Sequence, residues 1–296
     1  MPSVTKVTCS LLLLGLPTQA TGRSLTQRGG ELNRNLAATD EDLPEWTYRK
    51  TGVPGEEPYG PSDWSLGYPD CGLTKQTPIN IEADVLSVAT TLDQDIAFFP
   101  SLCNSTELTF TSNFAVWQVA YDLCAAAPYL QYQGETYNLL QFHIHAPSEH
   151  VFGGAEYAAE IHLVHLKEGT DDGLLVVGIM FDVSEYGNNV ELQPLWDVLG
   201  ADLDVGEAET SFLHNAYSLL PHTASFTTYS GSLTTPPCSE GVRWIVMTQP
   251  SFMGKRQLDE YLRSVALYDG SKVGEFGETN RPVQALNGRD VFTVNP

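Results

Sequence analysis

The segment QFHIHAPSEH, residues 141–150, gathers histidine in a chain that contains little of it. The chain has 7 histidines in 296 residues, and three of them lie within these ten positions. Side chains of a β-strand point alternately to opposite faces, so Gln141, His143 and His145 are predicted to share one face. A structural histidine needs no second histidine beside it, whereas a metal ion does. The spacing therefore indicates a metal site.

A second segment, AAEIHLVH at residues 158–165, supplies the third histidine. By the same alternation Glu160, His162 and Val164 share one face, and His165 points to the other. If the two segments form neighbouring strands, two histidines from one and a third from the other converge on one point. Three neutral imidazoles with an open fourth position are typical of catalytic zinc, whereas structural zinc has four protein ligands. The predicted Zn²⁺ ligands are His143, His145 and His162.

Two polar residues inside these apolar segments support the metal site. Gln141 and Glu160 each lie two positions before a predicted ligand, and burial without a partner would cost roughly 1–3 kcal/mol for each. A metal-bound histidine donates its second ring N–H to an oxygen acceptor, which gives both residues a role. A lone H-x-H pair is more often a surface or core pair, but the E-x-H of the second segment weakens that alternative. Cobalt or iron could use the same imidazoles, so the choice of zinc rests on ligand type.

The other histidines have different predicted places. His165 faces away from the triad, and a hydrogen-bonded position in the core is expected for it. His150 follows Glu149 in a turn-like stretch and is expected to hold loop structure. His214 and His222 lie in a separate part of the chain and receive no role.

The charge balance excludes some classes of partner. The chain has 15 Lys and Arg against 37 Asp and Glu, a formal net charge of -22. Such a charge repels nucleic acid and anionic lipid, and no basic patch offsets it, so no nucleic-acid partner is expected. The simplest explanation of the acidity is solubility in an exposed or salty compartment. The oligomeric state is left open.

The N-terminal residues have the layout of a secretory signal peptide. Lys6 precedes an apolar run at residues 7–16, followed by small and polar residues, and this run is too short to span a bilayer comfortably. Residues 1–20 are therefore predicted to be a signal peptide that directs a secreted, periplasmic or lumenal protein, with an uncleaved anchor as the weaker alternative. The C-terminal residues show no hydrophobic tail, so no membrane anchor is expected. Residues 21–58 are predicted to form a flexible polar lead-in or propeptide, and residues 59–296 a single domain.

Cysteine usage agrees with export. Cys9 lies in the predicted signal peptide, and the even set that remains suits two disulfides in an oxidising compartment, with three pairings open. None of these cysteines has the close paired spacing of a thiolate zinc site. Asn104 begins an N-glycosylation acceptor sequence, a pattern that also arises by chance. The cysteines outside the signal peptide are Cys71, Cys103, Cys124 and Cys238.

Short β-like segments dominate residues 59–296. They are rich in β-branched and aromatic residues with turn residues between them. Helical periodicity is confined to a few places, such as residues 190–200 and 255–265. The sequence therefore predicts one mainly β domain with a few short helices.

These motifs resemble those of the α-class carbonic anhydrases. QFHIHAPSEH, AAEIHLVH and YSGSLTTPPCSEGVRWIV (residues 229–246) are similar to three diagnostic blocks of that family, in order and spacing. QTPINI (residues 76–81) and NRPVQALNGR (residues 280–289) are similar to two more. The form with Ala146 after the second histidine resembles microbial and algal members. The resemblance implies a single domain on a twisted, largely antiparallel central sheet of about ten strands, with zinc at the bottom of a conical cleft.

The resemblance also implies roles for individual residues. His143, His145 and His162 would be the zinc ligands. Thr234 would accept a hydrogen bond from zinc-bound hydroxide and pass its own proton toward Glu149. A Cys71–Cys238 disulfide would match one in exported members, which leaves Cys103 and Cys124 as a second pair. The substrate pocket would comprise an apolar wall and a water network, formed by Val164, Val176, Leu233, Trp244, Thr235 and Tyr59.

The activity that the resemblance implies is that of a zinc lyase, the reversible hydration of carbon dioxide to bicarbonate and a proton by attack of zinc-bound hydroxide. Fast members of the family carry a histidine that shuttles the proton, in a segment similar to NNGHxxxV. Here TSNFAVWQV (residues 111–119) places Phe114 or Ala115 at that position, and neither titrates near pH 7. An active enzyme with slow proton transfer is therefore expected.

Two other functions can be weighed against this one. A non-catalytic relative that serves as a secreted binding or storage protein would commonly lack a zinc histidine, whereas this chain has all three. A serine hydrolase is suggested only by the stretch YSGSLTT. The G-x-S-x-G pattern is not met there, because Gly231 and Ser232 are followed by Leu233, and this alternative is discarded.

Overall fold

The structure is a computed structural model that describes residues 44–49, 55–83, 86–88, 95–101, 108–113, 116–121, 126–199, 208–210, 215–222, 225–269, 273–274 and 277–294. Several predictions fall outside these residues. They concern the signal peptide, His214, Asn104, the Cys103–Cys124 pair, and the shuttle position at Phe114 or Ala115.

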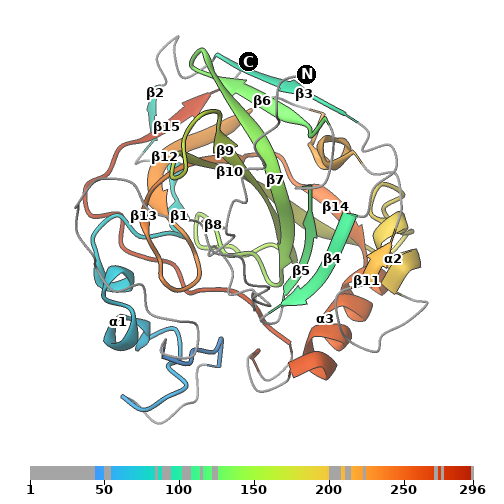
Figure 1. Ribbon diagram of the computed structural model, residues 1–296, viewed down its shortest axis with the longest axis horizontal. Coiled ribbons are helices and arrows are strands. Elements are labelled where there is room, and N and C mark those ends of the chain that lie inside the picture. The colour runs from blue at the N-terminus through green and yellow to red at the C-terminus, as the bar shows by residue number, and fades with distance from the viewer. Residues whose placement is uncertain are drawn as a thin grey trace, which may run out of the picture.

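A 13-stranded sheet dominates the described part of the chain, curving around a central space in Figure 1. The longest path through it runs β11-β4-β5-β7-β9-β10-β13-β12-β15-β2, with β14 added to β10 and with β6 joining β3 to β7. Its strands are β2 (Leu86–Val88), β3 (Ile96–Phe99), β4 (Leu108–Asn113), β5 (Val116–Ala120), β6 (Tyr129–Tyr132), β7 (Glu135–His145), β9 (Ala159–Lys167), β10 (Leu174–Ser184), β11 (Ala208–Thr210), β12 (Phe226–Ser232), β13 (Glu240–Met247), β14 (Ser251–Gly254) and β15 (Val291–Val294). Separately, β1 (Asn80–Ile81) pairs with β8 (Val151–Phe152).

The predicted mainly β architecture on a largely antiparallel sheet is confirmed. Most neighbouring strands are antiparallel, but β10 runs parallel to both β13 and β14, and β15 runs parallel to β2. The sheet is therefore mixed. Parallel neighbours need a long connection between them, and that connection carries no local sequence signal.

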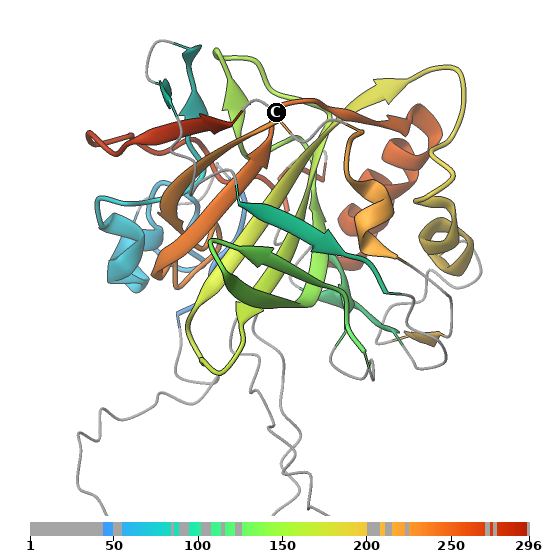
Figure 2. The same ribbon diagram turned by 90° about the horizontal axis from the view of Figure 1, so that it is seen from above.

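The helices are few and lie around the sheet. They are α1 (Trp64–Gly67), α2 (Gln193–Leu199) and α3 (Lys255–Asp269), with 3₁₀ turns η3 (Pro69–Gly72) and η5 (Ala216–Leu219). In both ribbon views α1 lies on one side of the sheet, and α2 and α3 lie on the other (Figures 1 and 2). Helical periodicity was predicted at residues 190–200, which contain α2, and at residues 255–265, which lie within α3. No helix within the described ranges is long and apolar enough to cross a membrane.

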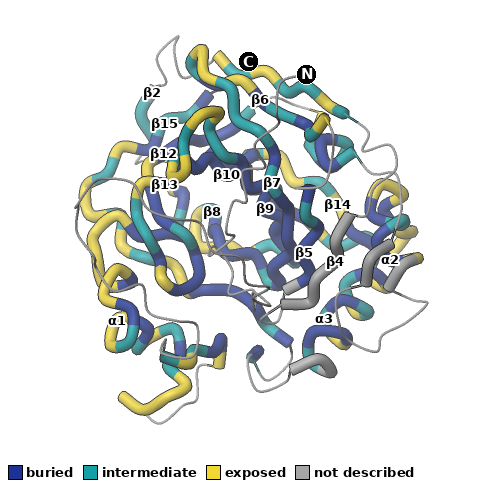
Figure 3. Tube along the Cα trace, viewed as in Figure 1, coloured by how far each residue is buried: buried dark blue, intermediate teal, exposed yellow. Residues whose placement is uncertain are grey.

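The central strands β7, β9 and β10 are covered on both faces. Seven successive residues of β9, from Ala159 to His165, are buried, and so are the first eight of β10. Figure 3 shows this buried centre in dark blue, with exposed loops around it. On one face of β9, Ile161 and Leu163 pack into the main apolar cluster. The opposite face carries Glu160 and His162, so the sheet separates the hydrophobic core from the polar site.

Residues 44–49 correct one part of the predicted flexible lead-in, because they pack against the domain. Thr47 N–H donates to the carbonyl of Tyr59, and Tyr59 N–H donates to the carbonyl of Glu45. Trp64 Nε1 donates to the Thr47 carbonyl at 3.1 Å, and Tyr48 is only 2% exposed. Two aromatic residues flank Thr47 in an otherwise polar stretch, and the area they bury favours docking.

Candidate metal centre

The two histidine segments form neighbouring antiparallel strands. In the β7–β9 pair His143 lies directly opposite His162, and His145 lies opposite Glu160. Opposite residues of an antiparallel pair point to the same face, so the three histidines meet on the side of the sheet away from the main core. One ring nitrogen from each of His143, His145 and His162 falls within 4.8 Å of the other two.

The outer nitrogen of each imidazole faces an oxygen acceptor. His143 Nδ1 lies 2.8 Å from Gln141 Oε1, and His162 Nε2 lies 2.8 Å from Glu160 Oε1. His145 Nδ1 lies 2.6 Å from the backbone carbonyl oxygen of Thr279. Because these oxygens accept and do not donate, each outer nitrogen carries the ring proton. The inner nitrogens are therefore lone-pair nitrogens.

Three lone pairs that face one point fit a metal ion. His162 Nδ1 and His143 Nε2 lie 3.3 Å apart, and His145 Nε2 is buried without a hydrogen-bond partner among the described residues. A tetrahedral zinc with ligand nitrogens at 2.0–2.1 Å would separate those nitrogens by about 3.3–3.4 Å. The donor set, the spacing and the unpartnered nitrogen all match a site with three imidazole ligands.

Burial keeps the two ligands from β7 uncharged. It lowers the pKa of His143 well below its usual value, and the neighbouring histidines lower it further. The pKa of His145 is also lowered by burial, although Glu149 acts in the opposite direction. Neutral imidazole is the form that binds metal, so the surroundings favour the binding-competent state.

The two buried carboxylates of the site have different surroundings. Burial alone would raise the pKa of Glu160, but His150 and His162 outweigh it and hold that pKa well below its usual value. Glu149 accepts from Arg281 N–H through Oε1 at 2.8 Å. Its Oε2 lies 3.6 Å from His145 Nε2 and 3.9 Å from His162 Nδ1, buried and without a hydrogen-bond partner in the described part of the chain.

A small cavity opens beside the triad. Its volume is about 30 Å³. It has an apolar wall and a polar floor, and it is lined by Gln141, His143, His162, Val164, Val176, Leu233, Thr234, Thr235 and Trp244. All of the predicted pocket residues except Tyr59 are in this set.

The two threonines of the loop after β12 lie at this cavity. Thr234 is 5% exposed and Thr235 is 6% exposed. Among the described residues no hydrogen bond joins Thr234 to Glu149, the pair that the resemblance connects. The structure thus places Thr234 next to two of the triad histidines without showing a contact with the carboxylate.

Tyr48, rather than Tyr59, lies against the triad. The Tyr48 ring packs edge-on to His145 with centroids 6.4 Å apart, and its hydroxyl is buried without a partner among the described residues. Tyr59 is half-buried, and its backbone pairs with residues 45–47. Tyr48 was not among the residues predicted for the site. The available signal was the aromatic–polar–aromatic triplet at residues 46–48 within a polar stretch.

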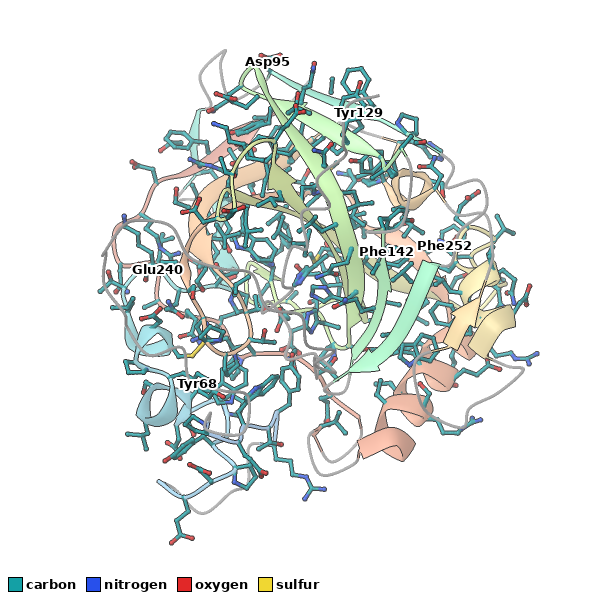
Figure 4. All side chains as sticks on the ribbon, viewed as in Figure 1. Tyr68, Asp95, Tyr129, Phe142, Glu240 and Phe252 are labelled. Carbon is teal, nitrogen blue, oxygen red and sulfur yellow. A yellow bond between two sulfur atoms is a disulfide. The ribbon has the colours of Figure 1, made fainter. Side chains whose placement is uncertain are left out.

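The Cys71–Cys238 disulfide is present and holds the Thr234 loop to the N-terminal part of the domain (Figure 4). In that view it lies between the labelled residues Tyr68 and Glu240. Cys238 N–H donates to the Thr235 carbonyl at 2.8 Å, so the bridge lies directly behind the cavity-lining threonines.

The other described histidines are not members of the triad, although His150 is linked to it through Glu160. His165 is buried and bonds to the Tyr217 hydroxyl at 3.0 Å, as predicted for a core histidine. His222 is exposed. His150 is buried and bonds to Glu160, a connection that its place in a turn-like stretch did not indicate.

Comparison with known proteins gives a consistent result. The model of the eukaryotic-type carbonic anhydrase family matches residues 59–295. A carbonic anhydrase from Nostoc sp. is 35% identical over 238 residues, which cover 79% of this chain and 82% of the relative.

Two solved structures are similar over most of the chain. The α-carbonic anhydrase from Thermovibrio ammonificans in complex with the inhibitor sulfanilamide gives a TM-score of 0.67 at 32% identity. The match covers 84% of this chain and 99% of that one. Dioscorin complexed with ascorbate gives a TM-score of 0.69 at 25% identity. The match covers 85% of this chain and 98% of that one.

Proposed function

The chain belongs to the eukaryotic-type carbonic anhydrase family, and from this premise we propose that it catalyses the zinc-dependent, reversible hydration of carbon dioxide to bicarbonate and a proton. One observation carries the proposal: three imidazole lone pairs converge beside a small cavity with an apolar wall. The family is zinc-dependent, and zinc would be held by His143, His145 and His162. When bound, it supplies a Lewis acid that makes hydroxide available near neutral pH.

The outer partners of the triad fix the direction of each imidazole. Gln141, Glu160 and the Thr279 carbonyl each accept one ring proton and so keep the opposite nitrogen free for the metal. The ring directions are thus fixed by the protein's own hydrogen bonds. Pre-organised ligands lose little freedom on binding, which favours affinity and a fixed geometry.

The cavity can hold carbon dioxide next to the triad. Val164, Val176 and Trp244 form a wall without charges, which suits a linear molecule with no net dipole. The Thr234 hydroxyl lies on the same cavity, where its oxygen can accept a hydrogen bond from the reacting hydroxide. Its contribution is orientation, which raises the rate by holding the reacting atoms in line. In the proposal Glu149 is the acceptor for the Thr234 proton.

Export remains part of the proposal. The predicted signal peptide at residues 1–20 and the Cys71–Cys238 disulfide both support a secreted, periplasmic or lumenal location, since disulfides persist in oxidising compartments.

The decisive test is stopped-flow carbon dioxide hydration by the zinc-loaded protein. We expect activity in the parent, loss of both activity and stoichiometric zinc in His162→Ala, and parent-like activity in the control His222→Ala, which removes an exposed histidine. Activity that survives His162→Ala would refute the assignment of the triad.

A second prediction concerns the proton that the reaction releases. Because Phe114 and Ala115 cannot carry a proton near pH 7, small imidazole-type buffers are expected to raise turnover at saturating carbon dioxide. The measurement is turnover against buffer concentration at constant pH and ionic strength. Phe114→His and Ala115→His serve as matched variants, and one of them should raise turnover at low buffer. If the turnover of the parent does not depend on buffer concentration, slow proton transfer is contradicted.

A second candidate function is binding of a small molecule without catalysis. The structural likeness to dioscorin, which was solved with ascorbate, is the observation that favours it. A folded, zinc-loaded parent without hydration activity would support this candidate. Calorimetric titration with ascorbate would then test binding.

A further inference from the structure

Glu160 is the centre of a buried hydrogen-bond network that extends beyond the metal ligands. Its Oε1 accepts from His162 Nε2 at 2.8 Å and from His150 Nδ1 at 2.7 Å. Its Oε2 accepts from the backbone N–H groups of Glu149 at 2.8 Å and His150 at 2.7 Å. A carboxylate offers about four lone-pair sites, so all of them are used here. Glu160 cannot rotate without breaking a buried hydrogen bond.

The network continues from His150 to the loop that carries Thr234. His150 Nε2 lies 2.7 Å from the Tyr229 hydroxyl oxygen, which in turn lies at hydrogen-bonding distance, 3.2 Å, from Thr77 Oγ1. Thr77 and Ser232 are joined twice: Ser232 N–H donates to Thr77 Oγ1 at 2.9 Å, and Thr77 N–H donates to Ser232 Oγ at 3.0 Å. Every member is buried. Hydrogen bonds therefore lead without a gap from a metal ligand to a residue two positions before Thr234.

We propose that His150 and Tyr229 are positioning residues that act on the zinc ligand His162 through Glu160, and that Thr77 ties this network to the Thr234 loop. The inference rests on the proposed function, because it concerns zinc at the histidine triad.

The physical basis is the direction of the His162 imidazole. Nδ1 is free for a metal only while Nε2 keeps its proton, and Glu160 accepts that proton's hydrogen bond. Two of the four donors to Glu160 belong to His150, whose ring is fixed at its far nitrogen by Tyr229. Without the Tyr229 hydroxyl, His150 Nε2 loses its partner in a buried position, and the restraint on Glu160 weakens. Loosened outer partners of a metal-bound histidine weaken metal binding.

Substitution by phenylalanine separates this hydrogen bond from packing. The Tyr229 ring stacks on Trp244, with centroids 6.5 Å apart and an interplanar angle of 15°, and phenylalanine keeps that ring. Tyr217 offers a matched control, because its hydroxyl also bonds to the Nε2 of a buried histidine, His165, at 3.0 Å. His165 belongs to the same strand as His162 but has no bond to Glu160.

The test is the rate of zinc release from the full-length, zinc-loaded protein into excess chelator. We expect release from Tyr229→Phe to be faster by roughly 3–10-fold, less than the 10–100-fold effects of directly bonded outer partners. Tyr217→Phe should release zinc within about twofold of the parent rate. Ring ¹⁵N spectra of the zinc-free protein should show a smaller share of the His162 Nε2–H form in Tyr229→Phe only.

Thr77 supplies a second pair of variants in case Tyr229→Phe does not fold. Thr77→Val removes the hydroxyl and should also speed release, whereas Thr77→Ser keeps it and should restore the parent rate. Equal release rates in the parent, Tyr229→Phe and Thr77→Val overturn the proposal and leave the network a packing feature. A parent that takes up no zinc overturns the proposed function, and this inference with it.

Discussion

Two histidines three positions apart in β9 have opposite surroundings. His162 faces the polar site, whereas His165 faces the main core and has one described side-chain partner, the Tyr217 hydroxyl. Burial lowers the pKa of His165 to about 3. In the unfolded chain the same group titrates near its ordinary value, about 6.5.

The unfolded state therefore binds the His165 proton more readily than the folded state between about pH 6.5 and pH 3, so stability falls as pH falls through this window. From pH 6.5 to pH 5.0 this one group should lower the free energy of unfolding by about 1.5 kcal/mol. His165→Gln does not titrate there and keeps a hydrogen-bonding group. Urea unfolding of both zinc-loaded proteins at the two pH values measures the difference. Equal losses in parent and variant would show that His165 is not the responsible group.

At the residue scale, sequence reasoning succeeded where period-two alternation applies. Alternation predicted Gln141 and Glu160 beside His143 and His162, to which they are hydrogen-bonded, because residues two apart on a strand share a face. It could not find the third acceptor, the Thr279 carbonyl, since every residue has a carbonyl and the residue type gives no signal. Tyr48 was missed for another reason, because its apolar contacts come from distant parts of the chain.

Among the elements, β12 is packed closely against Thr77 and Trp244 behind the site. Its pairing with β13 shifts register between Gly231 and Ser232. A Cβ added at Gly231 would collide with Thr77 Oγ1 and would lie 2.9 Å from Trp244 Cδ1. Only glycine leaves room there for the Thr77 hydroxyl.

Gly231→Ala is therefore expected to lower the free energy of unfolding by about 1–3 kcal/mol, because the surrounding side chains must shift. Gly72→Ala is the matched control. Its added Cβ would meet only exposed Ser65, at 3.2 Å, and should change stability by less than about 0.5 kcal/mol. Chemical denaturation of both variants measures the effect. Similar stabilities for the two variants would show that β12 adjusts without strain.

The elements themselves were largely predictable, whereas their arrangement was not. Runs such as LLVVGIMF in β10 are apolar throughout, which indicates a strand buried on both faces. That β10 pairs in parallel with β13 depends on a connection from Ser184 to Glu240 that contains α2, β11, η5 and β12. Local patterns do not report such long-range pairings, so the sequence does not indicate which strands of the largely antiparallel sheet pair in parallel.

At the scale of the whole molecule, the Cys71–Cys238 disulfide closes a loop of 167 residues. A cross-link over so long a loop restricts the unfolded chain, and its loss commonly costs about 2–5 kcal/mol. The double variant Cys71→Ser with Cys238→Ser should lose stability in this range. Urea unfolding without reductant measures it, with Ser62→Ala, a neighbouring exposed serine, as the control. A loss of stability below about 1 kcal/mol would show that the cross-link contributes little and that tertiary contacts stabilise the fold without it.

The hydrogen bond from His145 to the Thr279 carbonyl spans 134 residues, and this separation has a consequence for biosynthesis. A ribosome adding ~5–20 residues per second takes roughly 7–27 s to proceed from one residue to the other. For most of that interval the three histidines have already been synthesised, whereas the acceptor of His145 Nδ1 has not. The ring direction of His145 can therefore be fixed only after nearly the whole chain has been made.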